Sequence, residues 1–209
     1  AQGEQRKQFF TMSTPRLIVS SEAAQLGLQA TFLVVDRLQN QPTHAAFGDF
    51  EASLCEGLIP IYSSEFVATD KIVQGFRELH RAVGCSPKKF PCSIEGLIKF
   101  VRKRRALPRI NLVVDCYNAV SYETRLTLGA HDLDKVAGNI SLSVANGDEI
   151  FVPLGSDQLE PIKAGEYCYV DEEDDVLCRL DYRQCDKSKL TLTTRRCLFI
   201  VQGHAQTSM

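Results

Sequence analysis

Side chains suited to acid–base chemistry gather in the stretch 107–134, where His131 is followed directly by Asp132. A carboxylate beside an imidazole can orient the ring and raise its pKa, which suits a general base. The alternative is that Asp132 caps a helix or turn while His131 packs at its edge. Asn118 follows Asp115 by three residues, and its amide could contact a carbonyl or amino group, or tie down the turn.

A second polar group lies near the C-terminus, where Arg183, Asp186 and Lys187 crowd a short loop. The guanidinium group of an arginine presents a planar fork that binds a carboxylate or a phosphate. The alternative is that these charges pair with one another within the loop.

A run of four cations, Arg102, Lys103, Arg104 and Arg105, stands at the end of a predicted helix. Cations at a helix C-terminus complement the helix dipole. Four in succession exceed what that effect needs, so phosphate contacts are the second interpretation, with Lys88 and Lys89 as further candidates.

Composition limits the classes of protein. The 209 residues are 44% hydrophobic and 24% charged, with a net charge of -2, so no global field draws the chain to DNA or another polyanion. The eight cysteines lie mostly in apolar runs without a Cys-x-x-Cys pair, which favours free thiols in a reducing, cytoplasmic setting and predicts no structural zinc.

The apolar runs have the length of strands, so we expect no membrane span. We find no nucleophile elbow, phosphate loop or dinucleotide fingerprint.

Periodicity places the elements that must hold these residues. Three helices are predicted over 45–58, 64–83 and 94–105, and a buried strand over 110–115, followed by a short helix and a loop that carries Gly129 and His131. The second half is rich in predicted strands, up to a last one over 197–201. Helices first and strands later argue for an α+β fold around a mixed sheet. We expect flexible tails at 1–12 and 204–209 and a single domain over 13–203.

The sequence LPRINLVVDCYNAVSYETRLTLGAHDLDKVAG resembles the B3/B4 domain of the bacterial-type phenylalanyl-tRNA synthetase β subunit. The likeness extends to FVPLGSDQLEPIKAGEYCYVDEEDDVLCRL and TLTTRRCLFIV, and it covers roughly residues 64–201. It is closer still to free-standing B3/B4 proteins, whose pattern is matched by SIEGLIKFVRKRRALPRIN. The resemblance implies a partly barrel-like sheet with helices packed mainly from the N-terminal half.

In the synthetase this domain hydrolyses tyrosine wrongly esterified to the phenylalanine tRNA. The resemblance therefore implies a free-standing editing hydrolase that acts on aminoacyl-tRNA without a metal or cofactor, and no synthetase activity from this chain alone. A non-catalytic module that binds tRNA or an amino acid in the same pocket is the alternative, and a pure interaction protein is a third possibility. The oligomeric state is not predicted.

The resemblance carries over unevenly. Asp115 and Asn118 match the motif, whereas Gly129 stands where the family has its editing histidine and Lys187 replaces the glutamate that reads the tyrosine hydroxyl. The predicted catalytic residues are thus His131, Asp132 and Asn118. The predicted substrate-binding residues are Asp115, Asn118, Gly129, Arg183, Lys187 and Thr191, and the predicted tRNA-binding residues are Lys88, Lys89 and Arg102 to Arg105.

Overall fold

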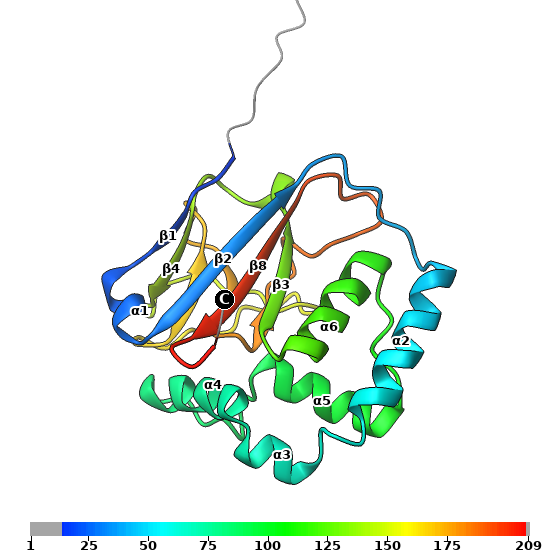
Figure 1. Cartoon of the computed structure of the whole chain (residues 1–209). Helices are drawn as coiled ribbons and strands as arrows, with labels where there is room; N and C mark the ends of the chain where they lie inside the picture. Colours follow the sequence, from blue (N-terminus) through cyan, green and yellow to red (C-terminus); the bar gives the residue numbers. More distant parts are fainter. Residues whose placement is uncertain (1–13, 208–209) are drawn as a thin grey trace, which may run out of the picture.

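The computed structural model describes residues 14–207, and the predicted tail at 1–12 lies outside them. The fold is α+β, as predicted. The helices are α1 (Ser21–Gln25), α2 (Ala45–Leu58), α3 (Ser64–Thr69), α4 (Lys71–Ala82), α5 (Ser93–Arg104) and α6 (Leu112–Thr124). Helices α2 to α6 gather on one side of the strands (Figure 1). None of the helices described is long and apolar enough to cross a membrane.

The strands form two sheets. The larger has the order β1 (Leu17–Val19), β4 (Ile140–Val144), β5 (Tyr167–Val170), β6 (Val176–Arg179) and β7 (Arg183–Gln184). The smaller places β8 (Cys197–His204) between β2 (Leu28–Val35) and β3 (Thr127–Asp132), both antiparallel to it. The β1–β4 pair is parallel, so the larger sheet is mixed. Within the described chain the strands do not close into a barrel.

One cluster of buried apolar side chains joins both sheets to the helices. Tyr167, Leu177 and Leu198 come from the strands, and Phe76 and Ile98 come from α4 and α5. Because this cluster draws on segments from both halves of the sequence, it fixes the helices against the sheets.

The predicted strand over 110–115 is wrong, because α6 begins there. The side chain of Asn111 caps the helix by accepting a hydrogen bond from the backbone N–H of Val114 at 3.2 Å. Asp115, Ala119 and Tyr122 then face the interior at helical spacing. A short apolar run is compatible with a strand or with a buried helical turn, and here the cap and the helical spacing decide.

The predicted helix over 64–83 is two helices, because Asp70 adopts an extended backbone between α3 and α4. Its backbone N–H donates to the carbonyl oxygen of Phe66 at 2.7 Å, which ends α3. Its carboxylate accepts from the backbone N–H of Val73 at 3.0 Å, which caps α4. One aspartate therefore ends one helix and begins the next.

The expected C-terminal tail over 204–209 starts one residue too early, because His204 is the last residue of β8 and is buried. Its Nε2 lies 2.8 Å from the carbonyl oxygen of Ile72, and its ring meets Phe76 edge-on. A Cβ at Gly75 would lie 2.1 Å from the imidazole, so only glycine lets α4 dock on β8 here.

Candidate functional site

A cavity of about 190 Å³ lies where α6, β3 and β8 meet the larger sheet. It is lined by both polar and apolar side chains: Ser93, Tyr117, Asn118, Thr127, Leu128, Gly129, His131, Tyr169, Cys178, Leu180, Asp181, Tyr182, Arg183, Gln184, Ile200 and Gln202. Four residues predicted from the sequence, Asn118, Gly129, His131 and Arg183, therefore meet at one site. A mostly apolar hollow with a few convergent polar groups is the usual form of a ligand site.

Asn118 and Gly129 enter the cavity from two different elements. Asn118 lies on α6, and within residues 14–207 its amide has no hydrogen-bond partner. Gly129 lies on β3, and a Cβ added there would meet no atom within 4 Å. The position that holds a histidine in the resembling family is thus open space here.

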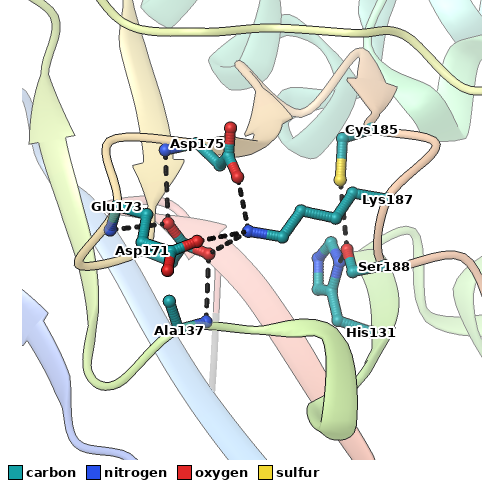
Figure 2. Close-up of polar contacts among 8 residues, drawn as sticks. All are labelled: His131, Ala137, Asp171, Glu173, Asp175, Cys185, Lys187 and Ser188. Atoms are coloured by element: carbon teal, nitrogen blue, oxygen red, sulfur yellow. Dashed lines mark hydrogen bonds and ion pairs between the residues drawn. The ribbon is translucent and has the colours of Figure 1, made fainter.

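His131 is buried on β3, two residues after Gly129 and on the same face of the strand. Its Nδ1 lies 2.7 Å from the hydroxyl oxygen of Ser188, which also contacts Cys185 (Figure 2). No described residue hydrogen-bonds its Nε2. Burial lowers the pKa of His131 from 6.5 to about 4, so the ring is neutral at pH 7.

The predicted support of His131 by Asp132 is wrong. One oxygen of Asp132 accepts from the hydroxyl of Thr194 at 2.7 Å, and the other caps the short 3-10 helix Leu133–Lys135 by accepting from the backbone of Asp134. Adjacent strand residues point to opposite faces, which separates the carboxylate from the imidazole. The alternative of a capping aspartate holds, and no carboxylate raises the pKa of His131.

Lys187 does not line the cavity. Its ammonium group reaches the acidic turn 171–175 instead, where it pairs with Asp171 at 3.1 Å, with Glu173 at 3.4 Å and with Asp175 (Figure 2). Burial alone would lower the pKa of Lys187, but the hydrogen bonds and charges of Asp175 and Asp171 outweigh it and raise that pKa. The sequence prediction of a substrate contact at Lys187 is replaced by a structural role.

Two other predicted substrate residues also lie outside the cavity wall. Asp115 is fully buried and accepts a hydrogen bond from the backbone N–H of Ile110 at 2.8 Å, so it holds the start of α6. Thr191 is exposed in a turn, where its hydroxyl lies 2.9 Å from that of Thr193. The motif aspartate therefore positions the helix that carries Asn118.

Arg183 lines the cavity and is 39% exposed, with Glu160 at 3.8 Å and the carbonyl oxygen of Leu154 at 3.2 Å. A pair this long at the surface contributes little to stability. Its guanidinium group thus keeps donors available for an anionic ligand.

Sequence reasoning missed three buried polar residues of the wall, Thr127, Asp181 and Gln202. For the last two the signal was present, because Asp181 follows the mainly apolar segment 176–180, which also holds Arg179, and Gln202 follows the apolar run 197–201. The polar residues after these two segments line the cavity, whereas the run 110–115, at whose end such groups are expected, forms a helix instead.

A second hollow, of about 350 Å³, adjoins the cavity and shares Ser93, Asn118, Leu128 and Tyr182 with it. It continues along α5 past Leu97, Phe100 and Pro108. The four cations 102–105 stand at the end of that helix, all exposed, and Lys88 and Lys89 are exposed in the loop before it. The four cations 102–105 thus lie at the end of a helix that forms part of the wall of the second hollow.

The chain was compared with known proteins and families. The chain is similar in structure to an N-terminal fragment of the phenylalanyl-tRNA synthetase β subunit from Pyrococcus horikoshii, at 13% sequence identity and a TM-score of 0.47. The match covers 91% of this chain and 44% of that fragment, so the chain spans less than half of its length. None of the curated proteins matches. The family model of the B3/4 domain matches residues 76–209, which is more than half of the sequence. The chain therefore belongs to the B3/4 domain family.

Proposed function

We propose that this chain binds the aminoacyl end of an aminoacyl-tRNA in the cavity and hydrolyses its ester bond. The observation that carries the proposal is the convergence of Asn118, Gly129, His131 and Arg183 from α6, β3 and β7 on one cavity. Membership of the B3/4 family and the exposed cations of α5 support a tRNA-related ligand. We place the reaction in the cytoplasm, where all eight cysteines, free in this structure, would stay reduced.

The reaction requires little from the protein beyond positioning. A water oxygen adds to the ester carbonyl carbon, and the bond from that carbon to the ribose oxygen then breaks. The amino acid leaves as a carboxylate. Of the two protons of the water, one passes to the ribose oxygen and restores the hydroxyl of the tRNA, and the other is released to the solvent. An aminoacyl ester is already activated, so a held water and one donor to the developing oxyanion account for useful acceleration.

The residues divide this work according to their surroundings. The unpartnered amide of Asn118 donates to the ester oxygen as charge develops on it. His131 is neutral, and its free Nε2 holds the water by a hydrogen bond. With a pKa of about 4 the ring is a weak base, so its role is to position the water rather than to remove its proton. Arg183 contacts the phosphate nearest the ester.

The rest of the tRNA would lie along the second hollow and the end of α5. Phe100 is 40% exposed there and offers an aromatic face to a nucleotide base. Lys103 and Arg104 form no hydrogen bond or ion pair within the described chain, so both charges are free to meet phosphates.

A non-catalytic binding module is the second candidate. The low pKa of His131 and the glycine at position 129 favour it, because the site then lacks a base of ordinary strength. In this case the cavity would bind the same aminoacyl end without accelerating hydrolysis.

The deciding experiment measures ester loss from a panel of mischarged tRNAs, with Asn118→Ala and His131→Ala beside the wild type. Removal of the Asn118 donor should slow hydrolysis roughly 10²-fold. Cys116→Ala is the matched control, since Cys116 lies on the same helix but is exposed outside the cavity. No acceleration on any charged tRNA, with tRNA binding retained, would refute the hydrolase and leave the binding module.

A further inference from the structure

Asp181 is a buried carboxylate in the cavity wall, and only one of its two oxygens has hydrogen-bond partners among the described residues. Its Oδ1 contacts Nε2 of His80 and accepts a hydrogen bond from the hydroxyl of Tyr167 at 2.9 Å. Its Oδ2 is buried and has no partner within the part of the chain that the structure describes. Buried polar atoms are nearly always hydrogen-bonded, so an orphaned carboxylate oxygen beside a cavity indicates a missing donor.

The charge of Asp181 is balanced on the side away from its free oxygen. Nδ1 of His80 faces the carbonyl oxygen of Phe90 at 2.8 Å, so that nitrogen carries a hydrogen. Burial alone would lower the pKa of His80, but the hydrogen bond and charge of Asp181 raise it overall. His80 and Asp181 therefore pair through Nε2 and Oδ1, which leaves Oδ2 free, and the Asp181 side chain is only 5% exposed.

Gln202 is a second buried polar residue of the same wall, and only one of its two amide atoms has a partner among the described residues. The hydroxyl of Tyr169 donates to its Oε1 at 2.9 Å, while Nε2 is buried without a partner among the described residues. Turning the amide over would exchange the two atoms and still leave one of them unpaired. The hydrogen bond from Tyr169 thus holds the carboxamide of Gln202 in place, and the other polar atom of that carboxamide stays free for a ligand.

The same wall also contains apolar side chains, Leu128, Leu180 and Ile200. A ligand that satisfies this site needs a strong donor for the carboxylate, a polar atom for the amide and a small apolar part. A primary amine fits the first requirement best, because it brings several N–H donors and, when protonated, an opposite charge.

We propose that Asp181 binds the free α-amino group of the aminoacyl ester through Oδ2, and that Gln202 donates to an oxygen of the same ligand. The ester part of this inference rests on the proposed function, whereas the amine site stands on its own geometry. The substrate class is then the unblocked aminoacyl ester, and esters whose amine is acylated, as in a peptidyl chain, are rejected.

Binding tests this without any need for hydrolysis. The probes are 3′-aminoacylamino-adenosines, stable amides of the ester, each made with a free amine, an N-acetylated amine or no amine. Calorimetry with the wild-type chain should show the free-amine form binding roughly 10- to 100-fold more tightly than the other two. Equal affinity of the three forms, or no binding of any free-amine probe, would overturn the inference.

Variants separate recognition from folding. Asp181→Asn should reduce the preference for the free amine to near unity, because the amide brings no negative charge. Tyr167→Phe is the matched control, since it removes a partner of Oδ1 and leaves Oδ2 untouched; the preference should persist there. If Asp181→Asn keeps the preference, Asp181 is not the amine site. If that variant fails to fold, the wild-type probe series still decides.

The outcomes also separate this inference from the proposed function. Ester hydrolysis that is equally fast on free and N-acetylated substrates would refute the amine site and keep the hydrolase. Amine-dependent binding without hydrolysis of any charged tRNA would refute the hydrolase and keep the amine site.

Discussion

Replacing His131 with glutamine should change how the stability of the protein depends on pH. The ring is buried, has a pKa of about 4, and hydrogen-bonds Ser188. In the unfolded chain the same group titrates near 6.5. Between these two values the unfolded chain binds a proton that the folded chain does not, so acid favours unfolding.

The magnitude follows from the two pKa values. Above pH 7 both states are neutral at His131 and the residue contributes no pH dependence. With a folded-state pKa of about 4, proton linkage lowers the free energy of unfolding by about 2 kcal/mol at pH 5 and by about 3 kcal/mol below pH 4. Glutamine cannot take up that proton, so in the His131→Gln variant the free energy of unfolding does not decrease in acid through this residue.

The assay is urea unfolding of both proteins at pH 7.5, 6 and 5. At pH 7.5 the variant should be less stable by about 1 kcal/mol, because the hydrogen bond to Ser188 is disturbed. The difference should shrink as the pH falls, reverse near pH 6 and leave the variant the more stable of the two by about 1 kcal/mol at pH 5. Ser188→Ala is the control: it weakens the same contact but keeps the titrating ring, so its deficit should stay constant with pH.

His80 provides a test of opposite sign. Because its folded-state pKa is raised, its stabilisation is complete below about pH 6.5 and is lost as the pH rises through the raised value. The deficit of His80→Asn should therefore shrink on raising the pH. A deficit of His131→Gln that stays the same from pH 7.5 to 5, or a ring pKa at or above 6.5 by NMR, would refute the burial argument for His131.

Three further perturbations test other parts of the structure. Lys187→Met should lower the free energy of unfolding by roughly 1–2 kcal/mol in urea titrations and leave ester hydrolysis unchanged, since Asp171 keeps its backbone donors; a selective loss of hydrolysis would return Lys187 to the site. Gly129→His should fold with a change below about 1 kcal/mol by thermal unfolding, because its side chain enters open space, and should raise hydrolysis; a large loss of stability would contradict the open space. Neutralising Lys103 and Arg104 with glutamine should reduce the slope of log affinity for tRNA against log salt by roughly 0.7–0.9 for each phosphate that is no longer neutralised, and an unchanged slope would remove them from the interface.

The class of the fold and several members of the site can be predicted from the order of the residues. Helices in the first half and strands in the second predict the α+β fold, and α2 and α5 lie within a residue of their predicted positions. Asn118, Gly129 and His131 were selected from one stretch, and the cavity contains all three. Local patterns suffice for these features because they depend on residues close together in the chain.

The chemistry open to those residues depends instead on neighbours that are distant in the chain. The run 110–115 is too short for periodicity to separate a strand from a buried helical turn, and the cap at Asn111 and the packing of α6 settle it. The protonation of His131 depends on burial, and its hydrogen-bond partner Ser188 lies 57 residues away in the sequence. Asp181 and Gln202 acquire their free polar atoms only where distant strands meet and leave a gap. A pKa and an unpaired atom are properties of the surroundings in space, and those surroundings form only when the chain has folded.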